Sequence, residues 1–335
     1  MGRELDTLPT APECTLPFWA GELLACPQCR GPLAYVTSAL RCGQCGEVGH
    51  YQDGIAQFNV TDNDPSIAWY HSVGGTRFCE RAQIPYTMSS LDTPVYHSYL
   101  ARVRPDRLTS VLLDLGAGDG RNTLPWLSWG YERIVAVDAI AESLARLQAR
   151  VRDEYPASLE NVLLIQADLR LLPLVSGSVA RAIAIETLFY LNEDYAAGLA
   201  ECRRVLEPGG LLLTAERSWE GALLTHLLYG GVEALCQLAK SRDVWDGEPG
   251  HRVRSRSFTE EELCAELARA GFVVLEKRGV PVLSVVLGYL RGQGAIAAAD
   301  ETYLPQVRQC LQMLAEQGAM RKAHVVTARP APEAR

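Results

Sequence analysis

Four cysteines near the start of the chain have the residue type and the spacing of a metal site. They form the pairs CPQC and CGQC, at Cys26, Cys29, Cys42 and Cys45. Two CxxC pairs joined by a short hairpin-like stretch can bring four thiolates to the corners of a tetrahedron, which is the geometry of structural zinc. Redox motifs or disulfides are the alternatives, and an export signal would favour them.

A second stretch, VLLDLGAGDG at residues 111–120, leads from an apolar run into glycines at alternate positions. Gly116, Gly118 and Gly120 would let the backbone turn sharply and pass close to a bulky ligand. The dinucleotide fingerprint GxGxxG is followed about twenty residues later by an acid that binds ribose. Asp138 stands at that place, but the third glycine comes one residue early. This spacing disfavours a dehydrogenase, as does the absence of a second glycine fingerprint.

The elements that must position these residues alternate between strand-like and helix-like segments. This order is typical of a parallel sheet with crossover helices. Thr259 and Glu262 have capping-box spacing at the start of one helix, and Gly271 marks its end. The expected strands are 110–116, 133–139, 161–169, 179–188 and 209–217, then 273–279 and 323–329, and the expected helices are 139–155, 193–210 and 258–272.

Together, DLGAGDG, VDA and ADL at three successive strand ends resemble the class I S-adenosylmethionine-dependent methyltransferases. The resemblance covers about residues 105–218 and 257–328, and a stretch at 67–81 is similar to the family's lid helix. Singly, Asp114 could instead buttress the loop and Asp168 could be a turn residue. The resemblance implies cofactor contacts from Tyr70, Arg77, Asp114, Gly116, Ala117, Gly118, Asp138, Ala139, Asp168, Leu169, Glu186 and Thr187.

Residues 22–60 around the cysteines carry a resemblance of their own. They are similar to the small zinc-ribbon proteins that serve as activator subunits of methyltransferases, which share CPxC, a Gly-Pro-Leu turn, CxxC and a DGI sequence. The approach to DGI departs from that pattern, because this chain reads GHYQDGI. Similar ribbons are also fused to the front of bacterial methyltransferases, including ribosomal-RNA guanine methyltransferases.

The resemblance implies transfer of a sulfonium methyl group to a nucleophile. The protein must then orient the acceptor, exclude water and, where needed, receive a proton. After the fourth strand the chain reads IETLFYL. This segment lacks the Asn/Asp-Pro-Pro-Tyr motif of amino-methylating nucleic-acid enzymes, and it contains no cysteine that could act as a nucleophile. Histidines picked in this way are more often structural than catalytic. The acceptor-side candidates are Tyr190, His97, His71 and His226.

Selectivity should come from the insertion at residues 219–256, after the fifth strand. Its first part has the pattern of an amphipathic helix that could cover an apolar acceptor, or simply pack on the core. Arg252, Arg254 and Arg256 recur at strand spacing and could clamp a carboxylate or phosphate, or lie in a solvated linker. Trp219, Trp245 and Tyr229 add aromatic candidates for the acceptor pocket.

The length and charge of the chain favour some classes of protein over others. The chain has 335 residues and a formal net charge of -8, so it carries no general basic footprint for nucleic acid. We expect no secretory signal, no membrane-spanning segment and a cytoplasmic location. The expected fold is α/β, a doubly wound mostly parallel sheet with a small N-terminal zinc ribbon and a helical insertion. The expected division is extension 1–21, ribbon 22–60, linker and lid helices 61–105, methyltransferase core 106–328 and tail 329–335.

Three functions follow as hypotheses. The first is methylation of an oxygen or nitrogen of a small molecule, which could be an anionic secondary metabolite, with S-adenosylmethionine as cofactor and structural zinc in the ribbon. The second is an RNA methyltransferase whose ribbon binds RNA through a patch around Arg30 and Arg41. The third is a non-catalytic S-adenosylmethionine-binding protein that docks a partner.

Overall fold

The computed structural model describes most of the chain. Residues 1–15, which include Cys14, and residues 333–335 lie outside the described part, so the predicted extension and tail are described only in part. The described residues are 16–60, 64–73, 75, 77–248, 251–297, 301–318 and 320–332.

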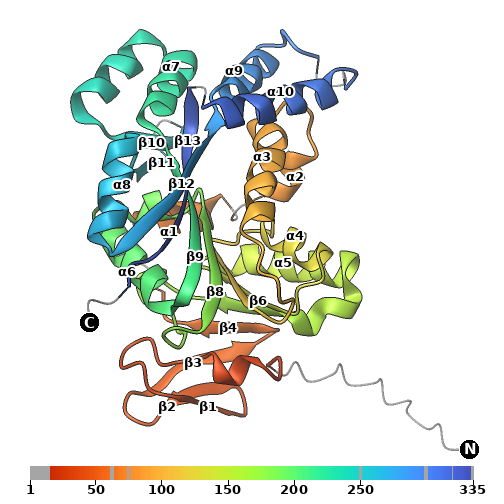
Figure 1. Cartoon of the computed structure of the whole chain (residues 1–335), viewed down its shortest axis with the longest axis vertical. Helices are drawn as coiled ribbons and strands as arrows, with labels where there is room; N and C mark the ends of the chain where they lie inside the picture. Colours follow the sequence, from red (N-terminus) through yellow and green to blue (C-terminus); the bar gives the residue numbers. More distant parts are fainter. Residues whose placement is uncertain are drawn as a thin grey trace, which may run out of the picture.

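Within these residues, a sheet of eleven strands runs through the molecule in the order β1-β2-β3-β4-β7-β6-β5-β8-β9-β13-β12 (Figure 1). Strands β4 to β9 in that order pair in parallel, and β13 and β12 are antiparallel. All seven core strands predicted from the sequence are present. Their bounds are β5 Val111–Leu115, β6 Arg133–Asp138, β7 Val162–Gln166, β8 Val179–Ile185, β9 Leu206–Arg217, β12 Phe272–Pro281 and β13 Arg321–Pro330.

Helices cover both faces of the parallel strands. The three predicted helices are present as α5, α6 and α8, and Thr259 and Glu262 form the predicted capping box of α8. Helices α4, α9 and α10 were not predicted, and α3 lies in the segment 61–105, where lid helices were expected but not delimited beyond the stretch 67–81. The helix bounds are α1 Pro65–Ser72, α2 Phe78–Ala82, α3 Met88–Arg102, α4 Thr123–Ser128, α5 Ala141–Glu154, α6 Tyr195–Val205, α7 Trp219–Ser241, α8 Glu260–Arg269, α9 Leu283–Gly292 and α10 Leu304–Gln317, with short 3-10 turns η1 Ala20–Glu22, η2 Pro156–Asn161 and η3 Leu188–Asp194.

The apolar strands bury side chains on both faces, which is why they read as continuous apolar runs. In β5, Leu113 and Leu115 pack into a cluster with residues of α6 and α8. Leu112 points to the other face and packs with residues of α3, α4, α5 and α10. This alternation places Asp114 on the face of α4, directly before the glycine loop.

The cysteine-bearing segment is continuous with the main sheet. Its strands are β1 Leu33–Val36, β2 Ala39–Cys42, β3 Gly46–Gln52 and β4 Ile55–Phe58, and β4 pairs in parallel with β7. Trp19 and Leu24 share the hydrophobic cluster of the core, and Arg30 donates to the Leu172 carbonyl at 2.9 Å. The sheet therefore crosses the predicted boundary at residue 60.

The insertion after β9 is a kinked helix followed by a hairpin. Gly231 interrupts α7 with φ 71° and ψ -170°. Strands β10 Val244–Glu248 and β11 His251–Ser255 then pair antiparallel. Within the described residues, α7 alone is long and apolar enough to cross a membrane by length and composition, which is weak support for a span. In Figure 1, α7, α9 and α10 lie at the end of the molecule opposite β1–β3.

Candidate functional site

A cleft opens at the carboxyl ends of the parallel strands, where ligands of such sheets bind. Its floor is the loop after β5, its sides come from the ends of β6, β7 and β8, and α1 covers it. The lining residues are Asp64, Ser66, Ile67, Tyr70, Phe78, Gly116, Ala117, Arg121, Asn122, Asp138, Ala139, Ile140, Asp168, Leu169, Arg170, Ile185, Glu186, Thr187, Tyr190 and Leu191.

The glycine loop is shaped by close packing. Gly116 has φ +68°, and a Cβ placed there would lie 2.2 Å from Thr187 Oγ1. The Gly118 amide donates to Asp138 Oδ2 at 2.8 Å, and the Ile140 amide donates to Oδ1 at 2.9 Å. The loop after β5 is thereby fixed to the end of β6, and the Asp138 carboxylate is held at the cleft wall.

Two buried acids beside the loop have raised pKa values. Burial raises the pKa of Asp138 to about 6, although the amides of Ile140 and Gly118 oppose this shift. Burial also raises the pKa of Asp114 to about 7, although a hydrogen bond from Thr123 acts to lower this pKa. Thr123 Oγ1 donates that bond to Asp114 Oδ2 at 2.6 Å. Asp114 does not line the cleft, so the structure places it beneath the loop as a buttress.

Most of the predicted cofactor residues converge on this cleft. Asp114, Gly118 and Arg77 do not line it, and Arg77 lines a neighbouring cavity instead. The Asp168 carboxylate forms an ion pair with the guanidinium of Arg170. The same guanidinium also pairs with Asp64 at 3.3 Å and with Asp194 at 2.8 Å. The predicted residues that line the cleft are Tyr70, Gly116, Ala117, Asp138, Ala139, Asp168, Leu169, Glu186 and Thr187.

The cleft fits a ligand with net positive charge. Its lining has four carboxylates, Asp64, Asp138, Asp168 and Glu186, against two guanidinium groups, so the formal charge is two minus four, or -2. Such a wall attracts a cationic sulfonium compound. Asn122 also lines the cleft, and its buried Oδ1 has no hydrogen-bond partner among the described residues. That oxygen could accept a hydrogen bond from an ammonium group of the ligand.

The predicted lid stretch lies over the cleft. The Asp64 side chain caps α1 by accepting from the Ser66 amide at 2.9 Å. Tyr70 of α1 meets Tyr190 edge to face, with ring centroids 5.4 Å apart. The Tyr190 hydroxyl in turn donates to Asp246 of β10 at 3.1 Å. The lid, η3 and the hairpin of the insertion therefore meet at one point.

A second cavity of about 1320 Å³, open mouth included, adjoins the cleft. Residues of α1, α2, α3, α7, β10 and β13 line it, among them Trp69, Trp245 and His226. The two hollows share a wall, which consists of Tyr70, Phe78, Arg121, Glu186 and Tyr190.

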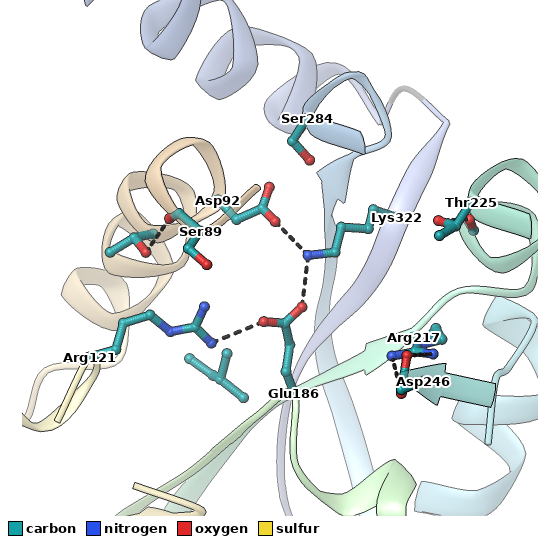
Figure 2. A network of polar contacts seen from close by, with 12 residues as sticks. Ser89, Asp92, Arg121, Glu186, Arg217, Thr225, Asp246, Ser284 and Lys322 are labelled. Carbon is teal, nitrogen blue, oxygen red and sulfur yellow. Dashed lines mark hydrogen bonds and ion pairs between the residues drawn. The ribbon is translucent and has the colours of Figure 1, made fainter. Parts of the chain in front are cut away.

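A network of charges occupies this shared wall (Figure 2). Glu186 pairs with Arg121 at 3.0 Å and with Lys322 at 2.8 Å, and Lys322 also pairs with Asp92 of α3. Burial by itself would raise the pKa of Glu186, but Lys322 and Arg121 outweigh it and hold this pKa well below its ordinary value. Glu186 has φ 55°, so its backbone is held in the left-handed region at the end of β8.

The four acceptor-side candidates separate into two groups. Tyr190 and His226 line the second cavity. His97 Nε2 is hydrogen-bonded to the Arg121 carbonyl at 2.8 Å, and His71 Nδ1 lies 3.4 Å from Glu142 Oε2. Neither His97 nor His71 lines the cleft or the second cavity.

Of the substrate candidates of the insertion, Trp245 lines the second cavity, and the others do not. Tyr229 packs edge to face on Tyr289, with centroids 5.3 Å apart, and Trp219 stacks under Arg242. The Arg254 guanidinium pairs with Glu193 and Asp243, and Arg256 pairs with Glu266. Arg252 is exposed. The three arginines thus form no shared clamp.

Several residues of the shared wall and of its charge network were not predicted from the sequence. Arg121 directly follows the glycine loop and Phe78 directly follows Arg77, so position alone could have suggested both. Lys322 and Asp92 have no such local signal, because they come from the last strand and from a helix whose bounds were not predicted. Arg121 also lies over the Phe78 ring, 4.4 Å from its centroid.

The four predicted metal ligands are brought together. The sulfur atoms of Cys26, Cys29, Cys42 and Cys45 all lie within 4.8 Å of one another, and no pair among them forms a disulfide. Tetrahedral zinc with Zn–S bonds of about 2.3 Å separates its sulfurs by about 3.8 Å. The cluster therefore has the size and the donor set of a structural zinc site.

Comparison with known proteins agrees with the geometry of the cleft. A family model described as a methyltransferase domain matches residues 112–210. The ubiquinone/menaquinone biosynthesis C-methyltransferase of Acidiphilium cryptum is 32% identical over 174 residues, which are 50% of this chain and 67% of that protein. The malonyl-[acyl-carrier protein] O-methyltransferase of Xylella fastidiosa is 35% identical over 109 residues, which are 32% of this chain but only 35% of that protein.

A solved structure shows the same fold. It is that of a candidate S-adenosylmethionine-dependent methyltransferase from Listeria monocytogenes, with a TM-score of 0.50 and 14% identity over 72% of this chain and 99% of the other. The matched family model lies on the strands that build the cleft, and the identity to the C-methyltransferase extends over two thirds of that protein. The chain belongs to the class I S-adenosylmethionine-dependent methyltransferases.

Proposed function

We propose that the protein methylates a small molecule that binds in the second cavity, which we call the acceptor cavity. The shared wall of Tyr70, Phe78, Arg121, Glu186 and Tyr190 carries this proposal. A cofactor in the cleft and an acceptor in the cavity would face each other across that wall. The C-methyltransferase and O-methyltransferase relatives support such a reaction class, and the methylated atom is proposed to be oxygen or nitrogen.

The cleft residues fit S-adenosylmethionine, which when bound supplies a methyl group on an electrophilic sulfonium. Asp138 would accept hydrogen bonds from ribose hydroxyls, and Asp168 and Leu169 would frame the adenine. Tyr70 and Tyr190 would exclude water from the space between cofactor and acceptor. We propose these roles because the side chains line the cleft on three successive strand ends.

His226 is the proposed general base. Its Nδ1 lies 2.9 Å from the Ala222 carbonyl, which can only accept, so Nδ1 carries the proton. Among the described residues Nε2 has no hydrogen-bond partner, and the neutral ring can take a proton there from an acceptor hydroxyl or amine. We expect His226→Gln to lower kcat about 100-fold with little change in KM. His71→Gln is the control, and equal losses in both variants would contradict the assignment.

The ribbon is proposed to bind one structural zinc ion and to brace the sheet edge beside β7. The RNA alternative receives less support from the charges. Arg30 pairs with Glu201 at 3.0 Å, and Arg41 pairs with Glu47 at 3.3 Å, so both arginines of the suggested patch already have acidic partners.

Methyl transfer can be followed directly. The protein is incubated with methyl-labelled S-adenosylmethionine and either a panel of phenols, carboxylic acids and amines or total RNA. We expect label in a small-molecule product, and we expect Asp138→Ala to abolish it while the exposed-surface control Asp153→Ala does not. Label in RNA, or label in neither pool, would contradict the proposal.

A further inference from the structure

The acceptor cavity has an excess of positive charge. Its lining holds five cations, namely Arg77, Arg81, Arg121, Arg217 and Lys322, and three carboxylates, namely Asp92, Glu186 and Asp246. The difference, five minus three, is a formal charge of +2, opposite in sign to that of the cofactor cleft. A cavity of this kind raises the local concentration of anions.

The inner cations do not provide this excess, because each has an acidic partner. Figure 2 shows Lys322 between Asp92 and Glu186, and Arg217 beside Asp246. The Arg217 guanidinium donates two hydrogen bonds to Asp246, both at 2.9 Å. Arg121 pairs with Glu186 at 3.0 Å. The excess therefore resides on Arg77 and Arg81.

Arg77 and Arg81 are free to bind an anion. Arg77 is the N-cap of α2, the Arg81 amide of the same helix donates to the Arg77 carbonyl at 3.0 Å, and both residues line the acceptor cavity. Arg77 contacts only Glu80, at 3.8 Å, and the side chains of this pair are 54% and 57% exposed, which makes the pair weak. Among the described residues, the Arg81 guanidinium has neither an ion pair nor a hydrogen bond.

The rest of the cavity offers flat apolar surfaces. Trp69, Phe189, Tyr190 and Trp245 all line it. We propose that the acceptor is a planar small molecule bearing a carboxylate or phosphate, and that Arg77 and Arg81 bind this group as a guanidinium pair. The inference rests on the proposed function, which it deepens by naming the acceptor class.

Matched naphthalene probes test the proposal by calorimetric titration. The protein is first saturated with S-adenosylhomocysteine and then titrated with 2-naphthoate, 2-naphthyl phosphate or the uncharged 2-naphthamide. We expect at least one anion to bind about tenfold more tightly than the amide, since hydrogen bonds to charged groups are the stronger ones. The comparison of carboxylate with phosphate shows which oxyanion the pair takes.

Variants locate the effect. Arg77→Gln and Arg81→Gln are each expected to weaken anion binding about fivefold or more and to leave amide binding unchanged. Arg107→Gln, at an exposed arginine that lines neither hollow, is the control. Equal binding of all three probes, an unchanged preference in both variants, or no binding of any probe to the loaded protein would overturn the inference. Failure of the proposed function is distinct, because it would appear in the labelling experiment as label in RNA or in neither pool, whereas the probe titrations need no turnover.

Discussion

At the scale of single residues, Asp138 links the glycine loop to the cleft. Its two oxygens hold the amides of Gly118 and Ile140, and each retains a lone pair for a ligand hydroxyl. The same carboxylate thus shapes the loop and is available to the cofactor. Replacing it should affect cofactor binding more than it affects any other property.

Asp138→Ala is expected to weaken S-adenosylmethionine binding at least about 100-fold, because two charge-assisted hydrogen bonds are lost. Calorimetry measures the affinity, and thermal unfolding shows whether the variant still folds. Asp153→Ala, at an exposed position on α5, should bind like the parent protein. An unchanged affinity in a folded Asp138→Ala protein would contradict the role of this residue.

Cofactor binding should also depend on pH through Asp138. With a pKa of about 6, the carboxylate is ionised above pH 7, and affinity should fall progressively as pH drops below 6. The effect on folding has the opposite sign. Because the folded-state pKa is raised, ionisation of Asp138 lowers the stability of the folded protein. This loss of stability is absent below pH 3.8 and complete above about pH 6. Affinity that stays level from pH 8 to pH 5 would contradict this account.

At the scale of elements, the ribbon is joined to the core through the parallel pairing of β4 and β7. Strand β7 neighbours β6, which ends at Asp138. The segment is too small to hold its fold by its own burial, so a metal bound by the four cysteines would add to its packing on the core. The stability of the sheet edge should therefore depend on the metal.

Cys26→Ser is expected to lower the zinc content from about one per chain and to reduce thermal stability, because one of four ligands is lost. Elemental analysis and calorimetry measure the two effects. Cys236→Ser, at an exposed free cysteine, is the control. A fully folded protein that carries no zinc would contradict the assignment.

The core strands were predictable because buried parallel strands are continuous apolar runs that end in glycine or acidic residues. Helix α3 was not, because Pro94 and scattered polar residues obscure its apolar face. The contact of β4 with β7 was not predictable either, since pairing between distant strands leaves no local pattern. Arg77 was assigned to the cofactor from its position in the chain, whereas in three dimensions it lines the acceptor cavity.

At the scale of the whole molecule, the charge network of the shared wall joins segments that are far apart in the chain. Asp92 comes from α3, Glu186 follows β8, and Lys322 belongs to the last strand (Figure 2). The Asp92 carboxylate is 1% exposed, so it depends on Lys322 for its counter-charge. Removing one partner of such a buried pair lowers the free energy of unfolding more than replacing both partners does.

Lys322→Met is expected to destabilise the protein by about 3–5 kcal/mol, and Asp92→Asn in the same chain should restore part of that loss. Denaturant unfolding of the single and double variants measures the coupling. Lys277→Met removes a half-exposed lysine that pairs with Glu260 and should cost under about 1 kcal/mol. Additive effects of the two substitutions would show that the pair does not couple.

We infer that the cleft binds S-adenosylmethionine and not a nicotinamide dinucleotide. Calorimetric titration of the purified protein with S-adenosylmethionine and, separately, with NADH tests it most directly. We expect saturable binding of about one S-adenosylmethionine per chain and no binding of NADH. Binding of NADH with similar affinity, or binding of neither compound, would contradict it.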